Sequence, residues 1–181
     1  GQDPGGGRVR AVPEHHVEQD DRDIRIGTVL GLQATVPEDA FTASTLGTVN
    51  IIGNTVRNTV LTPPSCNTSG ISYEFYTGVI EHNSLSGAVA ACAAPGGRNL
   101  PGAIAIGEQV PGVRPANVAV RFNDIVGNAH AGLRIGARQT IPIDATCNWW
   151  GHPSGPSGTG PGSGDAVVVE AGASVPVTTP Y

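Results

Sequence analysis

The chain has 181 residues, which is enough for one domain. Its formal net charge is −5 and it contains no lysine, so we expect neither nucleic acid nor an anionic membrane surface as a partner. No apolar run is long enough to cross a bilayer, and we expect no membrane insertion. The 26 glycines and 15 prolines make up more than a fifth of the chain and predict many bends between short elements.

The chain begins with a glycine-rich segment that becomes strongly charged. It contains Glu14, His15 and His16, and several acids follow. Adjacent side chains on an extended chain point in different directions, so this group does not predict a metal site. Calcium is the one ion that the oxygen-rich acids would suit, and no other cofactor is expected. We expect residues 1–22 to form a flexible or irregular leader and residues 23–181 to form the domain.

Four copies of one short motif run through the domain. In each copy, small or branched apolar residues precede an asparagine, and an apolar residue follows two positions later. The copies are Val49–Val56, Gly78–Leu85, Val118–Ile125 and Ile143–Trp150. Their asparagines are separated by 29, 40 and 25 residues. Recurrence at such intervals is typical of repeat architectures in which successive units stack.

A second motif, two apolar residues around a variable one and then a glycine, recurs at Asp23–Gly27, Ala103–Gly107 and Gly132–Gly136. The alternation in both motifs predicts β-strands. One such strand cannot bury its apolar side alone, whereas equivalent strands stacked about 4.8 Å apart bury a continuous column. These strands run in the same direction when each connection is a full coil of chain. The sequence therefore predicts an all-β fold, a single-stranded parallel β-helix of about six coils.

The recurring asparagines are expected to form a structural ladder of Asn54, Asn83, Asn123 and Asn148. Asparagine tolerates left-handed backbone angles and bonds to nearby backbone, so it suits a tight bend between two short strands. In a stack, each amide can donate to the coil on one side and accept from the coil on the other. The alternative is that the asparagines mark unrelated turns.

The C-terminal third carries further motifs, at Asn123–Gly136 and Ile143–Gly151, then a Gly/Pro loop and a strand beginning at Gly164. This part of the chain resembles the end of a pectate-lyase-like, right-handed parallel β-helix repeat protein of the bacterial secreted or surface type, with its Asn-Trp-Trp-Gly ending. The resemblance implies right-handed coils and an extracellular or bacterial cell-surface location. It assigns no activity, because the family includes lyases, hydrolases, epimerases and non-catalytic modules.

Alignment on the asparagines predicts which outward side chains lie in rows. One row contains Ile52, Glu81, Arg121 and Thr146. A second row, one place past the asparagine, contains Thr55, Ser84, Asp124 and Trp149. We expect Glu81, Arg121 and Asp124 to share an exposed sheet face with His82 and His130 nearby. These three residues are the candidate catalytic residues, and together with Trp149 they are the candidate ligand-binding residues. The alternative is a solvated face with an occasional Glu–Arg pair. Arg134 and Asp144 are equally expected to be surface salt-bridge partners.

These candidates fall short of a catalytic set. A polysaccharide lyase needs groups that neutralise the uronate, a base and an acid, and a glycosidase needs two carboxylates flanking the bond. The only pair that the rows offer is Glu81 with Asp124. We therefore expect a non-catalytic β-helix module that is structural or binds a glycan or another ligand. The alternative is a carbohydrate-active domain, a lyase, epimerase or glycosidase acting on an extended glycan. Polysaccharide or other surface components are the expected partners, and the oligomeric state is left open.

The three cysteines give a separate prediction. Cys66 follows Asn54 by 12 residues and Cys92 follows Asn83 by 9, so the two lie at similar places on successive coils. Stacked positions about 5 Å apart are within reach of a disulfide bond, which would fit an extracellular setting. The alternative is two buried thiols. Cys147 is expected to pack under Trp149 or Trp150 as a small apolar residue.

Overall fold

The computed structural model describes residues 9–10, 16–17, 24–26, 48–57, 60–61, 69–73, 76–90, 102–107 and 115–181. Over these residues the regular structure consists of β-strands, and no helix is present. Within this described part no helix of the length and apolarity needed to span a bilayer occurs. The predicted disulfide bond joins Cys66 and Cys92, both of which lie outside the described residues, as do Glu14 and His15.

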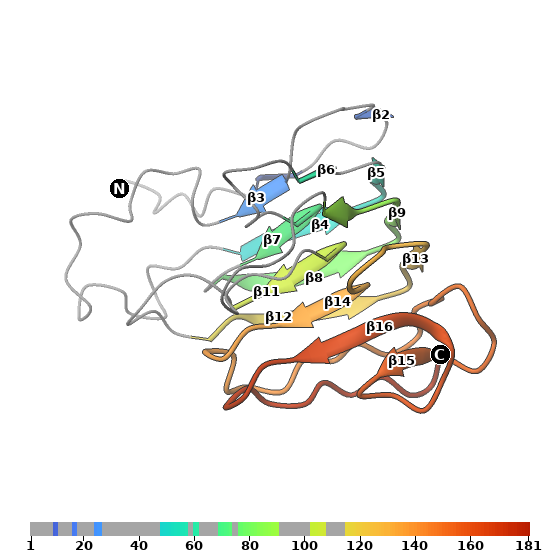
Figure 1. Cartoon of the computed structure of the whole chain (residues 1–181). Helices are drawn as coiled ribbons and strands as arrows, with labels where there is room; N and C mark the ends of the chain where they lie inside the picture. Colours follow the sequence, from blue (N-terminus) through green and yellow to red (C-terminus); the bar gives the residue numbers. More distant parts are fainter. Residues whose placement is uncertain are drawn as a thin grey trace, which may run out of the picture.

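The strands form three parallel sheets and one short pair (Figure 1). Sheet A contains β1 (Val9–Arg10), β4 (Thr48–Ile52), β8 (Thr77–Glu81) and β12 (Asn117–Arg121). Sheet B contains β2 (His16–Val17), β5 (Thr55–Arg57), β9 (Ser84–Ser86) and β13 (Asp124–Val126). Sheet C contains β3 (Ile24–Ile26), β7 (Ile71–Tyr73), β11 (Ile104–Ile106), β14 (Leu133–Ile135), β16 (Gly164–Val169) and β15 (Pro156–Gly158). The pair contains β6 (Val60–Leu61) and β10 (Val89–Ala90).

The chain visits the sheets in a fixed order. It passes from A to B to C and back to A three times, from β1 through β12, and within sheets A and B each new strand pairs in parallel with the previous visitor. Later segments continue the pattern: Asp144 pairs with Ala119 of sheet A, Val177 pairs with Asp144, and Trp149 pairs with Asp124 of sheet B. Figure 1 shows the resulting stack of strands, coloured in sequence order from blue to red.

Two strands lie within residues 1–22, which we expected to be a flexible or irregular leader. β1 pairs with β4, and β2 pairs with β5, so sheets A and B both begin before residue 23. The physical reason is that β4 and β5 would otherwise have an unpaired edge. Parallel pairing with β1 and β2 satisfies the backbone N–H and C=O groups at these edges.

The core consists of aliphatic columns that run through the stack. In sheet A one column contains Ile51, Ile80, Val120 and Ala145, and in sheet B one contains Val56, Leu85, Ile125 and Trp150. In sheet C the columns begin at Ile71 and Tyr73 and end at Val167 and Val169. Full burial of one such side chain stabilises the fold by about 1.5–3 kcal/mol. These columns explain the alternation in the sequence, because every second residue of a strand points inward.

Candidate functional site

The connection between sheets A and B is held by the recurring asparagines. Oδ1 of Asn83 accepts hydrogen bonds from the backbone N–H (2.9 Å) and the side-chain amide (3.1 Å) of Asn54. Asn123 accepts the same two bonds from Asn83 (3.0 and 2.9 Å), and Asn148 accepts them from Asn123 (both 2.9 Å). The structure thus joins all four residues in one ladder.

The ladder also satisfies the backbone of the preceding level. Nδ2 of Asn83 donates to the Ile51 carbonyl, and the equivalent atoms of Asn123 and Asn148 donate to the carbonyls of Ile80 and Val120. The last three asparagines are buried, and a buried amide is costly unless its donors and acceptors are paired. Their hydrogen-bonding capacity is used within the fold, so the ladder is a structural device and does not reach a ligand.

The residue before each asparagine makes the bend. Gly53, His82, Phe122 and Cys147 have φ angles of 71°, 56°, 56° and 57°. We had assigned the left-handed conformation to the asparagine itself, and the structure places it one residue earlier. In this conformation the side chain projects out of the corner, and all four positions are exposed. A left-handed backbone is unfavourable for residues other than glycine, so three of the four levels carry some backbone strain here.

Two of these bend residues form an exposed aromatic stack. The rings of His82 and Phe122 are 5.4 Å apart and inclined by 10°, which is a stacked arrangement. The Arg121 guanidinium carbon lies 5.8 Å from the centre of the Phe122 ring, within cation–π range. Phe122 keeps 49% of its surface exposed even so. About half of this aromatic side chain is therefore open to solvent beside a charged group.

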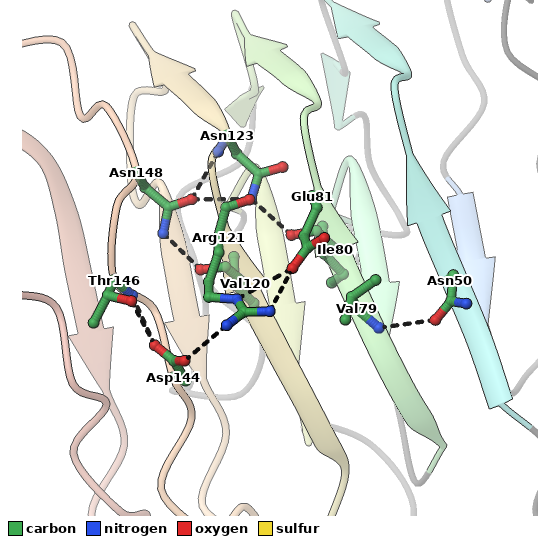
Figure 2. A network of polar contacts seen from close by, with 10 residues as sticks. All are labelled: Asn50, Val79, Ile80, Glu81, Val120, Arg121, Asn123, Asp144, Thr146 and Asn148. Atoms are coloured by element: carbon green, nitrogen blue, oxygen red, sulfur yellow. Dashed lines mark hydrogen bonds and ion pairs between the residues drawn. The ribbon is translucent and has the colours of Figure 1, made fainter.

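A polar cluster lies on the neighbouring face of sheet A (Figure 2). Nε and Nη2 of Arg121 donate to Oε1 of Glu81, at 3.1 and 2.8 Å, and Nη1 lies 3.6 Å from Oδ2 of Asp144. Asp144 also accepts a hydrogen bond from the Thr146 hydroxyl at 2.8 Å. The hydrogen bond to Glu81 is the main reason that the pKa of Arg121 is raised, and the charge of Asp144 adds to the effect. The guanidinium is therefore shared by two carboxylates.

Asp124 lies elsewhere than we expected. Glu81 and Arg121 are paired in sheet A, in the row that alignment of the repeats predicts, but Asp124 begins β13 in sheet B. The left-handed turn at Phe122 redirects the chain between Arg121 and Asp124. The second carboxylate at Arg121 is instead Asp144, which the sequence offered only as a surface salt-bridge partner. The available signal was the spacing: Asp144 lies two residues before Thr146, which occupies the Arg121 position in the last asparagine repeat. Side chains two residues apart on an extended chain point to the same face.

The remaining predicted residues separate into two places. Trp149 pairs with Asp124 in sheet B and is 46% exposed, so it lies beside the bend. Cys147 is exposed in the bend and does not pack under either tryptophan, because its left-handed backbone turns the side chain outward. His130 follows β13 of sheet B and lines a separate pocket, whereas Glu81 lies in sheet A. Arg134 is buried and bonds Glu170.

The separate pocket has a volume of about 310 Å³ and lies where the chain leaves sheet B. Asn128, His130, Ser157 and Asp165 are among its lining residues. The Asp165 carboxylate accepts hydrogen bonds from the N–H groups of Gly127 (3.0 Å) and Asn128 (2.9 Å) and from the Asn128 amide (2.7 Å). These bonds tie two parts of the chain together, so the carboxylate serves the fold.

We call the surface along the bend between sheets A and B the A–B corner. It comprises Glu81, His82, Arg121, Phe122, Asp124, Asp144, Cys147 and Trp149. Across the described residues, no three His, Cys, Asp or Glu side chains are grouped so as to hold a metal ion. The corner instead combines exposed aromatic side chains with charged groups, an arrangement that suits an organic, polar ligand lying along the surface.

Comparisons with models of protein families, with curated proteins and with solved structures gave no match. The resemblance of the C-terminal third to pectate-lyase-like repeat proteins is therefore a prediction. The function has to be argued from the sheets and from the A–B corner.

Proposed function

We propose that sheets A, B and C are the three faces of a right-handed parallel β-helix of the pectate-lyase-like type. The fixed order in which the chain visits the sheets from β1 to β12 supports this proposal, as does the parallel pairing of successive strands in sheets A and B. In sheet A, four strands and the two segments at Asp144 and Val177 supply six levels, in keeping with about six coils. Right-handedness follows from the strong preference of parallel crossovers for that hand.

We propose further that the chain is a non-catalytic, glycan-binding module of a secreted or cell-surface bacterial protein. One observation carries the binding role: Phe122 and Trp149 remain about half exposed at a corner that also presents hydrogen-bonding groups. The C–H face of a sugar ring packs on an aromatic ring while its hydroxyl groups bond to neighbouring polar side chains. The rigid stack of strands holds these groups in place before a ligand arrives, which lowers the entropic cost of binding.

A carbohydrate-active domain is the second candidate, because two carboxylates approach one another through Arg121. The same contacts argue against it. The general acid of a glycosidase must be free to donate a proton to the leaving group. Both carboxylates are bound to Arg121, so neither is left to act as a general acid without breaking an ion pair.

A glycan array on the purified protein, paired with a reducing-end assay on every glycan that binds, tests the proposal. We expect binding without product release, and we expect Phe122→Ala and Trp149→Ala each to weaken binding at least tenfold. Val175→Ala is the matched control, because Val175 is 61% exposed and lies outside the corner. Release of shortened or unsaturated sugars would establish the enzymatic alternative, and equal binding by all variants would exclude the corner as the site.

A further inference from the structure

The A–B corner carries an excess of negative charge. Glu81, Asp124 and Asp144 contribute three carboxylates, and Arg121 contributes one guanidinium, so the excess is 3 − 1 = 2 negative charges. Arg57 is exposed on β5, but it lies two strands away from Asp124, with β9 between them. The local imbalance has the same sign as the net charge of the whole chain, −5.

Among the described residues of the corner, the one cation is already bound by protein groups. Glu81 accepts from Nε and Nη2 of Arg121, and Asp144 lies against Nη1. A ligand carboxylate that binds this guanidinium has to share it with Glu81 and Asp144. It would also add a third negative charge beside Glu81 and Asp144, and like charges at short range repel. The corner therefore disfavours uronic acid chains and other anionic glycans.

Exposed aromatic rings beside carboxylates suit a ligand of opposite charge. A protonated amine is attracted to the face of Phe122 or Trp149 and to a nearby carboxylate at the same time. We propose that the corner selects glycans that carry protonated amino groups, with glucosamine chains as the simplest example. This inference rests on the proposed glycan-binding function and names the ligand class of the same site.

Isothermal titration with three hexasaccharides tests the inference: glucosamine hexamer, its fully N-acetylated form and galacturonate hexamer. The measurements use the unaltered protein at one pH, so that its charge is the same with all three ligands. We expect the glucosamine hexamer to bind about tenfold more tightly than the acetylated hexamer, with galacturonate weakest. The preference should shrink with added salt, because exposed charges are screened.

Charge variants separate the corner from the charge of the whole molecule. In the otherwise unaltered protein, Asp124→Asn combined with Glu81→Gln should reduce the preference for glucosamine to about twofold or less, because it removes both of these carboxylates. Arg138→Gln is the control, since it changes the net charge by one unit at an exposed turn after β14. It should leave the preference unchanged.

The two proposals fail differently. If the acetylated hexamer or the galacturonate hexamer binds as tightly as the glucosamine hexamer, the charge selection is overturned and glycan binding stands. If none of the three binds, the glycan-binding function itself is overturned. A preference that survives Asp124→Asn with Glu81→Gln, or that changes in Arg138→Gln, would overturn the assignment to the corner.

Discussion

Two bends in this molecule are held by the same kind of hydrogen bond but have different residues in the left-handed position. At the A–B corner, each asparagine follows a left-handed residue and donates its backbone N–H to the side-chain oxygen of the asparagine in the next level. Three such hydrogen bonds join the four asparagines. Where the chain leaves sheet B, Ala88 donates to Asn128 at 3.0 Å, and Asn128 donates to Asp165. The second ladder follows left-handed glycines at 87 and 127, with φ angles of 70° and 75°.

The difference between the bends lies in the left-handed residue. Glycine adopts this conformation without cost, but it has no side chain to present to solvent. At the A–B corner, His82, Phe122 and Cys147 accept the unfavourable backbone and project a side chain into solvent. Strain of this kind persists where the surrounding structure holds the residue in place, and the asparagine ladder supplies that hold. The comparison supports the proposal that the A–B corner is a binding surface.

The largest effect should come from breaking the continuous ladder. Asn123→Ala removes the acceptor for two bonds from Asn83 and the donor to Ile80, and leaves buried backbone groups without partners. We expect the free energy of unfolding, measured in urea, to fall by about 3 kcal/mol. Asn50→Ala is the control, because Asn50 is exposed and bonds only the Val79 N–H among the described residues. It should cost less than about 0.5 kcal/mol.

The shorter ladder should tolerate the equivalent change better. Asn128→Ala removes the bonds to Ala88, Leu85 and Asp165, and the Asp165 carboxylate keeps the N–H donors of residues 127 and 128. We expect a loss of about 2 kcal/mol in the same urea titration. A loss as large as that of Asn123→Ala would mean that the two bends are equally important to the stack, and the contrast between them would have to be given up.

The connection from sheet C back to sheet A uses a tyrosine in place of an amide. The Tyr73 hydroxyl donates to the Val49 carbonyl at 2.8 Å, and burial, reinforced by Tyr76, raises the pKa of Tyr73 above the usual tyrosine range. Folding therefore favours the protonated phenol. Its contribution is complete below the unfolded pKa of about 10, and it is lost as the pH rises from there through the folded pKa.

We expect Tyr73→Phe to cost about 1 kcal/mol at neutral pH and to lessen the loss of stability above pH of about 10. Urea titrations at neutral and at alkaline pH measure both effects. Tyr181→Phe, at an exposed position, is the control and should leave the alkaline loss unchanged. An identical alkaline loss in Tyr73→Phe and in the unaltered protein would contradict the assignment to Tyr73.

The smallest effects concern the bend residues themselves. Phe122→Gly should stabilise the fold by up to about 1 kcal/mol, because glycine relieves the left-handed strain, and it should abolish binding to the corner. Gly127→Ala should destabilise by about 1 kcal/mol for the backbone alone, since nothing lies within 4 Å of the added methyl group. Thermal unfolding measures both. A strong destabilisation by Phe122→Gly would show that the ring supports the fold.

Much of the arrangement was predictable from repeated local patterns. An all-β chain with parallel sheets is confirmed, because alternation reports strands and recurrence reports stacking. The register that pairs Glu81 with Arg121 follows from aligning the asparagines. The recurring asparagines marked the corner but did not identify its left-handed residue. The position before each asparagine holds a different residue type in every copy, and only Gly53 among them favours a left-handed backbone.

The sequence by itself determined the strands of the two repeated motifs, their parallel order and the columns that they bury, since a period of two and a recurring unit are properties of the chain alone. Only the tertiary structure decided which charged groups meet. Asp144 contacts Arg121 from another level of the stack, while Asp124, three residues from Arg121, lies on a different sheet. The reason is that a single left-handed residue turns the chain through a corner. Closeness in sequence across that turn therefore says little about closeness in space.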